Sequence, residues 1–379
     1  MLIIMTSPDA VLRAGAPDPE FVNVLIEAKR AGNPVALISN HAKPHWFQDV
    51  FGGSGVQFLQ ERGRQSGEIV SRNAERFKLN PFDVIVLASK DVDVQMGKNG
   101  RALLVATGAS AGNQVQSLGI RVRDADEFAQ VIQLTAGWSG HWWFSGDAPH
   151  YCVRALSDLS GYGKSITQQD FARRLTNTVK NGGARLNALL AVTARSLLID
   201  GADTVKNLVW GVYPSSQSAN DDSDTLCDFT HRLRTTVSRV RYAERGEPLF
   251  IRHTPSVKRS AGGGGDRTDP SGQMQTVHLN PRYNTGNQLR GKHVIVVDDC
   301  TTYGVSFGVA AAFLRKAGVA SVTGLALGKF GNQLRQYDIE ILTDPFAPVM
   351  AGQYVFKSSE QLHGTANPAS QQVLQTLIS

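Results

Sequence analysis

Short apolar runs alternate with amphipathic segments over the first part of the chain. The apolar runs predict strands at residues 1–5, 34–39, 84–88 and 102–107. The amphipathic segments predict helices at residues 20–31, 66–77 and 125–134. In the first of these helices, Phe21, Val24 and Leu25 recur at helical spacing. Strands that alternate with helices at this spacing predict a parallel α/β sheet.

The same alternation returns in the second half. Strands are predicted at residues 207–213, 247–252, 293–297 and 320–328, and a helix runs from Ser306 to Lys316 before Gly318. The fold class is therefore α/β, with two parallel-sheet domains at residues 1–136 and 137–379. The four glycines in 262–265 predict a mobile loop at residues 254–285. Residues 332–379 form a C-terminal extension that we assign to packing or assembly.

Composition narrows the class of protein. The chain has 379 residues, 41% hydrophobic and 19% charged, which are globular values. No apolar run has transmembrane length and the N-terminus lacks a basic flank, so we expect a cytoplasmic protein without membrane contact. Cys152, Cys227 and Cys300 are too widely spaced for a disulfide framework or a zinc ribbon. A net charge of +6 suits a small polyanionic ligand at least as well as nucleic acid, and the sequence has no basic run of the kind that favours nucleic-acid binding. A homodimer stays open.

The strongest chemical signal lies at His293-Val-Ile-Val-Val-Asp-Asp-Cys-Thr-Thr-Tyr-Gly-Val-Ser306. Asp298 and Asp299 end an apolar strand, where no core would accept two unpaired carboxylates. A turn of small hydroxyl residues with Gly304 leads into a helix. Carboxylates can hold sugar hydroxyls, while backbone N–H groups and a helix N-terminus can hold phosphate. The pattern predicts a site for a phosphorylated sugar.

This stretch resembles the phosphoribosyl-pyrophosphate (PRPP) signature of type I phosphoribosyltransferases, in which Asp-Asp-x-x-Thr-Thr-Gly-x-Thr follows an apolar strand. Tyr303 stands where the family has Thr, Cys300 where it has an aliphatic residue, and Ser306 replaces the last Thr. The resemblance implies Mg²⁺-dependent transfer of ribose 5-phosphate from PRPP to a base-like acceptor, with release of pyrophosphate. It implies that Asp298 and Asp299 are catalytic and contact the metal through ribose hydroxyls or water. The implied phosphate-binding residues are Thr301, Thr302, Tyr303, Gly304, Val305 and Ser306. Tyr303 would narrow this pocket or stack on a ligand.

The resemblance also implies a pyrophosphate loop and a closing lid. The loop after the 207–213 strand would be formed by Tyr213, Pro214, Ser215 and Ser216. The lid would carry Lys258, Arg259 and Arg267, in an arrangement similar to ComF-type relatives of amidophosphoribosyltransferases; the alternative is a surface linker. The acidic stretch 220–224 either caps the helix predicted at 224–240 or changes what the pocket accepts. Acceptor selectivity would come from residues 138–200 or from the C-terminal extension.

The first domain resembles the haloacid-dehalogenase (HAD) fold at three predicted strand ends. Ser7-Pro-Asp-Ala-Val-Leu12 is similar to its first motif, Ser39-Asn40 to its second and Ser89-Lys-Asp-Val-Asp93 to its fourth. The remnant comprises Ser7, Asp9, Ser39 and Asp93. Ser7 replaces the nucleophilic aspartate, while Asp9 keeps the acid–base position. A third-motif cation would be Lys78 or a nearby arginine. Because an aspartyl-phosphate needs a carboxylate nucleophile and Mg²⁺ needs negative charge, we expect no phosphatase activity. The alternative is an unrelated α/β domain.

Two further features leave alternatives open. The aromatic residues of 138–144 form either a stacking platform for a base or, as we favour, an apolar wedge at the domain junction. The chain as a whole is either the transferase described above or a regulatory protein that binds PRPP or a nucleotide without turnover. A nucleic-acid-binding regulator has the isoelectric point of about 9.2 and the arginine-rich 224–240 helix in its favour.

Overall fold

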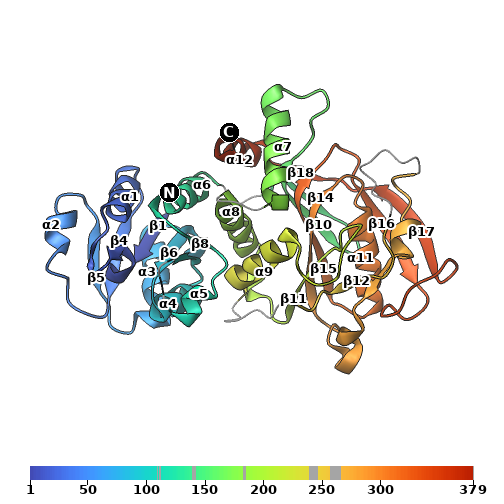
Figure 1. Ribbon diagram of the computed structural model, residues 1–379, viewed down its shortest axis with the longest axis horizontal. Helices are drawn as coiled ribbons and strands as arrows, with labels where there is room; N and C mark the ends of the chain where they lie inside the picture. Colours follow the sequence, from blue (N-terminus) through green and yellow to red (C-terminus); the bar gives the residue numbers. More distant parts are fainter. Residues whose placement is uncertain are drawn as a thin grey trace. The chain divides into compact units, whose positions relative to one another are not determined.

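The structure, a computed structural model, describes residues 1–108, 110, 112–138, 142–181, 185–238, 246–256 and 266–378. The chain forms two compact units (Figure 1). The first comprises Met1–Gly140, Gly183–Asp203 and His231–Ala243, and the second comprises His141–Gly182, Thr204–Thr230 and Glu244–Ser379. The division predicted after residue 136 lies near the end of the first segment. The first unit also takes in two later segments, which no linker-like composition marks.

The first unit is built on a parallel sheet. Its described strands have the order β5-β4-β1-β6-β7-β8. Their bounds are β1 (Ile3–Thr6), β4 (Val35–Ser39), β5 (Gln57–Gln60), β6 (Val84–Ala88), β7 (Leu103–Thr107) and β8 (Arg121–Val122). Every neighbouring pair is parallel. Strands β1, β4, β6 and β7 are buried along their full length, as expected when helices cover both faces. These four are the strands that the apolar runs predict.

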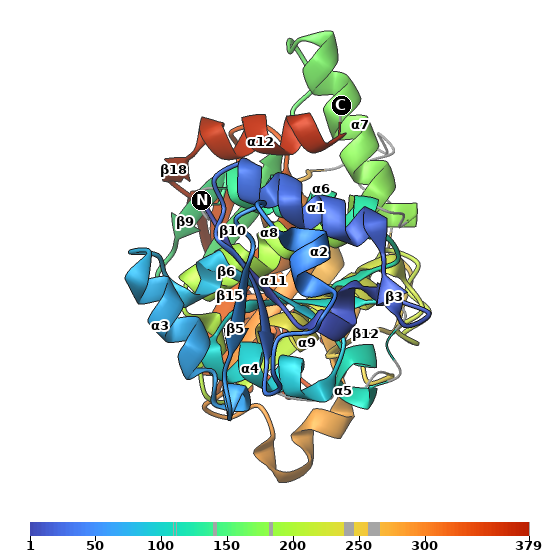
Figure 2. The same cartoon turned by 90° about the vertical axis from the view of Figure 1, so that its left-hand side faces the viewer.

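Helices cover both faces of this sheet (Figure 2). Helices α1 (Pro19–Arg30) and α6 (Ala125–Gly137) pack together on one face, and α8 (Arg185–Ile199) packs on α6. Helices α3 (Glu68–Arg76), α4 (Asp91–Gly100) and α5 (Asn113–Gln116) lie on the other face. A short α2 (Phe47–Phe51) precedes β5. Helix α4 follows directly on the segment similar to the fourth HAD motif, and the sequence reading did not predict it.

The second unit has a mixed sheet in the order β11-β14-β15-β10-β9-β18. The strands are β9 (Phe144–Asp147), β10 (Cys152–Asp158), β11 (Leu208–Val212), β14 (His293–Thr301), β15 (Ser321–Lys329) and β18 (Gly364–Ala366). Strands β11, β14, β15 and β10 are mutually parallel, whereas β9 and β18 are antiparallel. The parallel part agrees with the predicted fold class; the antiparallel edge was not predicted. The carboxyl ends of four parallel strands therefore meet at one edge, where α/β sheets bind ligands.

Helix α11 (Val305–Lys316) packs on β14, β15 and β16. Helix α7 (Ile166–Asn181) contacts α12 (Pro368–Ile378), and Ser165 Oγ, just before α7, accepts a hydrogen bond from Gln168 N (3.3 Å). The remaining described elements are α9 (Thr225–Val237), α10 (Ser271–Met274), the pair β12 (Phe250–Arg252) and β13 (Val277–Leu279), and the pair β16 (Arg335–Ile341) and β17 (Tyr354–Gln361). Since β18 joins the main sheet and α12 packs on β10, the C-terminal extension is part of this unit.

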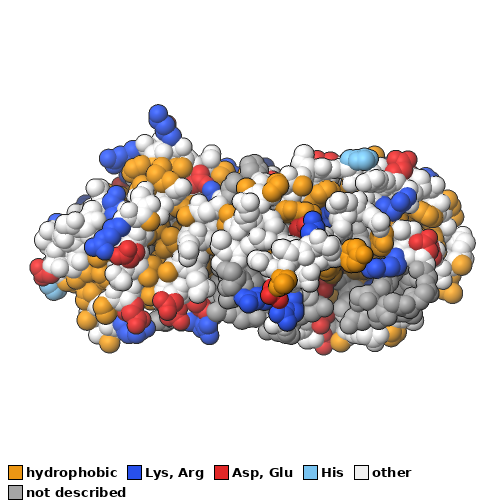
Figure 3. All heavy atoms as spheres, turned by 90° about the horizontal axis from the view of Figure 1, so that it is seen from above, with side chains coloured by type: hydrophobic (Ala, Val, Ile, Leu, Met, Phe, Trp, Pro, Cys, Tyr) orange, Lys and Arg blue, Asp and Glu red, His pale blue; other side chains and the backbone are white. Residues whose placement is uncertain are grey.

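None of the described helices combines the length and the apolar character that crossing a lipid bilayer requires. Lys, Arg, Asp and Glu side chains are interspersed on the face shown in Figure 3, without a broad area of one sign among the described residues.

Candidate functional site

The predicted site is organised by strand β14, which lies between β11 and β15. Val294, Val296 and Val297 are fully buried because β-branched side chains pack on both faces of a central strand. Tyr213 N donates to Val297 O (2.9 Å), which continues the pairing of β11 with β14 beyond the strand. Phe330 N donates to Thr301 O (2.8 Å) on the other side. The strand register thus brings the ends of β11, β14 and β15 together.

Asp298 and Asp299 are half-buried near the end of β14. Asp298 Oδ1 accepts a hydrogen bond from Asp299 N (2.9 Å), and Asp299 Oδ1 accepts one from Cys300 N (2.6 Å). Burial raises the pKa of the Asp298 carboxyl well above its ordinary value, and the charge of Asp299 raises it further. Hydrogen bonds from the Ser306 side chain and the Asp299 amide lower it in part. The two carboxyl groups are therefore not easily ionised at the same time, unless a ligand provides hydrogen-bond donors or positive charge beside them.

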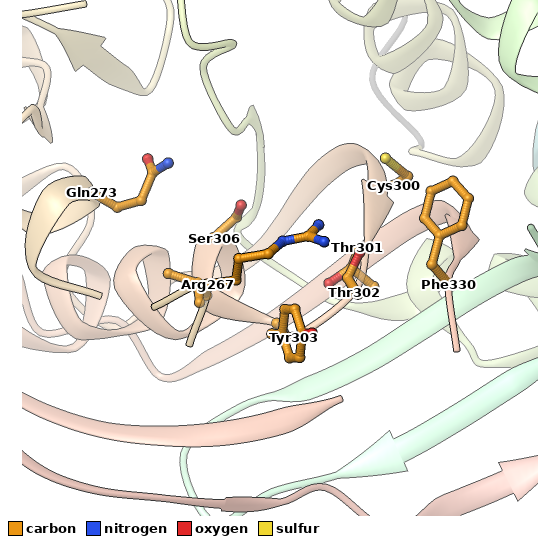
Figure 4. A pocket seen from close by; sticks show the side chains of 10 residues that line it. Arg267, Gln273, Cys300, Thr301, Thr302, Tyr303, Ser306 and Phe330 are labelled. Carbon is orange, nitrogen blue, oxygen red and sulfur yellow. The ribbon is translucent and has the colours of Figure 1, made fainter. Parts of the chain in front are cut away.

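The turn after the carboxylates lines a cavity of about 410 Å³ (Figure 4). Its wall contains all six predicted phosphate-binding residues, together with Arg267, Gln273, Cys300 and Phe330. Asp298 and Asp299 are not in this wall. Asp298 instead reaches it through its hydrogen bond with Ser306. The structure thus brings the hydroxyl turn and the carboxylate pair side by side, with Ser306 between them.

Gly304 is the residue that lets the chain enter helix α11. Its φ of +80° lies in the left-handed region, and a Cβ there would stand 2.7 Å from the carbonyl oxygen of Arg335. Val305 and Ser306 follow as the first residues of α11 and line the cavity. The first amides of a helix have no intrahelical acceptor, and the helix dipole is positive at this end. This end of the cavity is therefore suited to an anion.

Tyr303 and Arg267 meet in the cavity. The Arg267 guanidinium lies 5.4 Å from the centre of the Tyr303 ring and extends toward Thr301 and Thr302 (Figure 4). Arg267 was predicted as a lid residue and lies in the cavity wall. The other two predicted lid residues, Lys258 and Arg259, lie outside the described residues.

The predicted pyrophosphate loop follows β11 at the same edge of the sheet. Tyr213 OH donates to Gln273 Oε1 (2.9 Å), and Gln273 belongs to the cavity wall. The carbonyl oxygens of Pro214 and Ser215 accept hydrogen bonds from the buried Arg252. Arg252 was missed by the sequence reading, although a charged residue that ends an apolar strand was a usable signal.

The acidic stretch near the loop bonds locally. The Asp221 carboxylate accepts hydrogen bonds from both the amide and the hydroxyl of Ser223 (3.1 and 2.6 Å), and these bonds lower its pKa. Asp222 Oδ2 accepts one from Gly246 N (2.8 Å). In the helix that follows, Arg232 donates to Gly119 O within the first unit. This arginine therefore has a structural role in the first unit.

In the first unit, the residues that resemble HAD motifs form a closed cluster. Ser7 Oγ donates to Asp93 Oδ2 (2.9 Å), which also accepts hydrogen bonds from the amides of Ser89 and Lys90 (3.0 Å each). Arg64, in a short 3₁₀ turn before α3, places Nη1 2.7 Å from Asp93 Oδ1. The basic side chain beside Asp93 is that of Arg64; the cation of the third motif, expected at Lys78 or a nearby arginine, stays a prediction.

The polar residues of this cluster bond to one another. Ser7 and Asp93 are fully buried, and Arg64 neutralises the carboxylate. Asp9 is instead paired with Lys90 (2.8 Å), and Ser39 Oγ accepts a hydrogen bond from His41 N (3.0 Å). Among the described residues, no three Asp, Glu, His or Cys side chains gather where they could hold a metal ion. The cluster joins the ends of β1 and β6 through these hydrogen bonds and the ion pair.

The aromatic stretch divides between the two units. Trp138 is buried in the first unit and donates from Nε1 to Ser196 Oγ (2.8 Å). Trp142 and Phe144 are buried in the second unit. These three buried rings serve as apolar packing, whereas Trp143 of the same stretch is half-buried.

No sequence model of a known protein family matches this chain, and no curated protein matches it either. Solved structures do match in the N-terminal part of the chain. One is a protein assigned as a phosphoglycolate phosphatase from Lactobacillus delbrueckii subsp. bulgaricus: 18% identity, TM-score 0.27, covering 31% of this chain and 54% of that one. Another is the cobalt-bound deoxy-D-mannose-octulosonate 8-phosphate phosphatase of Haemophilus influenzae, with 12% identity, TM-score 0.30 and coverage of 37% and 91%. A third, assigned as a HAD family hydrolase from Streptomyces avermitilis, has 13% identity, TM-score 0.23 and coverage of 29% and 67%.

Proposed function

We propose that the second unit is a phosphoribosyltransferase, which transfers ribose 5-phosphate from PRPP to a base-like acceptor and releases pyrophosphate. One observation carries the proposal. The Asp298–Asp299 pair ends a central parallel strand and adjoins a cavity lined by the turn Thr301–Ser306. Carboxylates for hydroxyls and backbone donors for phosphate then stand next to each other, as a ribose 5-phosphate requires.

The phosphate end of the ligand is held by the turn. The hydroxyls of Thr301, Thr302 and Ser306 line the cavity, together with the first residues of α11. Hydrogen bonds from neutral donors to a phosphate oxygen are charge-assisted, and the helix dipole adds to them. The 5′-phosphate is thereby fixed at the start of α11, and the ribose is directed toward the carboxylate pair.

The carboxylate pair acts on the ribose. When ribose hydroxyls donate to Asp298 and Asp299, they favour the ionised carboxylates, and so oppose the burial and the charge of Asp299 that raise the pKa of Asp298. As the bond to pyrophosphate breaks, positive charge develops on the ribose ring. Two carboxylates preset beside it stabilise that charge electrostatically, without covalent catalysis.

The leaving pyrophosphate needs positive charge and amide donors. Arg267 lines the cavity, and the loop Tyr213–Ser216 follows the neighbouring strand. The substrate would bring a Mg²⁺ ion bound to its own oxygens. Asp298 and Asp299 would contact this ion through the ribose hydroxyls or through water. Bound there, Mg²⁺ would neutralise charge on the departing pyrophosphate. The first unit contributes no phosphoryl transfer in this proposal, because Ser7 is a buried serine.

A second candidate is binding of PRPP or a nucleotide as a signal, without turnover. The contact between Arg267 and the Tyr303 ring favours it, because an aromatic ring occupies a position in the phosphate turn where the family has Thr. One assay separates the two functions. The protein is incubated with PRPP, Mg²⁺ and a panel of nucleobases, while pyrophosphate release and PRPP binding are both measured. Release that depends on one base supports the transferase, and binding without release supports the regulator. No binding of PRPP at all would refute both.

A further inference from the structure

The guanidinium of Arg252 donates hydrogen bonds to the loop that follows β11. Arg252, the last residue of β12, is 5% exposed. Its Nη2 donates to the carbonyl oxygen of Pro214 (3.0 Å) and its Nε to that of Ser215 (2.6 Å). Two successive carbonyl groups of the loop are therefore turned toward the same side chain.

This arrangement fixes the direction of two amides. No peptide bond between described residues is cis, and in a trans peptide the C=O and N–H groups point in opposite directions. Because the Pro214 and Ser215 carbonyls face Arg252, the N–H groups of Ser215 and Ser216 point away from it. In the part of the chain that the structure describes, neither amide donates a hydrogen bond. Ser215 is exposed and Ser216 half-buried, so a ligand can reach them. Consecutive outward amides form the concave site that binds anions.

The position of Arg252 is itself fixed from several sides. Nη1 donates to Thr276 Oγ1 (2.9 Å), and Nη2 also donates to Gln273 Oε1 (3.0 Å). Its backbone N–H donates to Asn220 Oδ1 (2.8 Å). Gln273 belongs to the cavity wall and also accepts from Tyr213 OH, so the guanidinium joins the loop to that wall. The planar guanidinium of arginine, with its several N–H donors, can bond to all of these acceptors at once, whereas the ammonium of lysine cannot.

We propose that Arg252 is a positioning residue that presets the amides of Ser215 and Ser216 to bind the diphosphate group of the ligand. It is not in the cavity wall and acts through the loop, without touching the ligand. The inference rests on the proposed function, since the diphosphate is that of PRPP. It predicts that Arg252 governs the affinity for diphosphate and leaves the affinity for ribose 5-phosphate unchanged.

The test is calorimetric titration of the full chain with three ligands: inorganic pyrophosphate with Mg²⁺, ribose 5-phosphate, and PRPP with Mg²⁺. The variants are Arg252→Lys, which keeps the charge, and Arg252→Met, which removes it. Arg154→Lys is the control, because Arg154 also donates to a backbone carbonyl, that of Gly146, but lies in β10. Hydrogen bonds to a charged group contribute about 1.5–3 kcal/mol each, so losing one preset amide weakens binding roughly tenfold or more. We expect that loss for pyrophosphate and PRPP in both Arg252 variants, with ribose 5-phosphate binding unchanged and the control like wild type.

The outcomes separate the two proposals. If wild-type protein binds all three ligands and Arg252→Lys binds pyrophosphate as tightly as wild type, the role of Arg252 is overturned and the proposed function stands. If the variant loses affinity equally for ribose 5-phosphate, Arg252 is merely structural and the inference is also overturned. If wild-type protein binds none of the ligands, the proposed function fails first. Circular dichroism checks folding; should Arg252→Met not fold, Arg252→Lys alone decides.

Discussion

Replacing Asp298 by asparagine should stabilise the second unit at neutral pH. Under the proposed function, the same substitution should remove the binding of ribose at this site. In the folded protein the carboxyl is buried beside Asp299, and both causes raise its pKa. Asparagine has nearly the same shape and keeps an oxygen that can accept from the Asp299 amide, a bond of 2.9 Å in the wild type. The substitution therefore removes a repulsion and leaves most of the packing in place.

The size of the effect follows from opposing terms. Two ionised carboxylates about 4 Å apart repel by about 4 kcal/mol at an effective dielectric constant of 20. Asparagine keeps the bond from the Asp299 amide, so only the bond that Asp298 accepts from Ser306, roughly 1.5 kcal/mol, offsets this repulsion. The remainder is about 2.5 kcal/mol. We expect Asp298→Asn to raise the free energy of unfolding by about that amount at pH 7.

The pH dependence gives the prediction its sign. The folded-state pKa of Asp298 lies above the ordinary value of 3.8, so the protonated carboxyl's contribution to stability is complete below pH 3.8. This contribution is lost as the pH rises through the folded-state pKa. The difference between variant and wild type should therefore be small near pH 4 and grow toward pH 7.

Amide hydrogen exchange of peptides from β14, measured over this pH range, reports the stability of the second unit alone. Asp338→Asn is the control. Asp338 forms partly exposed ion pairs with Arg315 and His150 (3.5 Å each), so its loss should change stability by less than about 0.5 kcal/mol. An Asp298→Asn variant less stable than wild type at pH 7, or one whose gain is the same at pH 4 and pH 7, would refute the reasoning.

Three other substitutions probe the turn and the first unit. Gly304→Ala should lower stability by about 1–3 kcal/mol in urea unfolding and weaken PRPP binding, because its Cβ would stand 2.7 Å from Arg335 O; unaltered binding would contradict this. Burial lowers the pKa of Lys98 to about 8, so wild-type stability should rise by up to about 3 kcal/mol between pH 8 and pH 10.5, and Lys98→Met should lack that rise. If wild type and Lys98→Met showed the same pH dependence of stability in urea unfolding, this prediction would be wrong. Arg64→Met leaves Asp93 buried and unpaired and should cost about 3–5 kcal/mol in thermal or urea unfolding; a wild-type midpoint would show that the pair does not stabilise the unit.

The sequence predicts the parallel strands well and the rest of the fold less well. Buried strands such as β6 and β14 are continuous apolar runs, so their length and position can be read directly. Helix α4 was not predicted, because Asp91, Asp93 and two glycines interrupt the apolar pattern of its sequence. The antiparallel edge of the second sheet was also missed, since β18 is a short exposed strand and its pairing with β9 joins residues far apart in the chain.

The candidate site shows the same division. The turn Thr301–Ser306 can be located because it is continuous in sequence and follows an apolar strand. The contacts of Arg252 with Pro214 and Ser215 cannot be located from the sequence, since they depend on how β12 packs against the loop. Likewise, nothing in the sequence alone singles out Arg64 as the partner of Asp93.

The most direct test of the account is the affinity of PRPP, measured calorimetrically with Mg²⁺, for wild-type protein and for the double variant Asp298→Asn, Asp299→Asn. The double variant should fold, since removing the repulsion favours the folded state. The account predicts that wild-type protein binds PRPP and that the double variant binds it at least a hundredfold more weakly, because two charge-assisted contacts with the ribose hydroxyls, about 1.5–3 kcal/mol each, are lost. A double variant that binds PRPP as tightly as wild type would contradict the claim that this carboxylate pair holds the ribose.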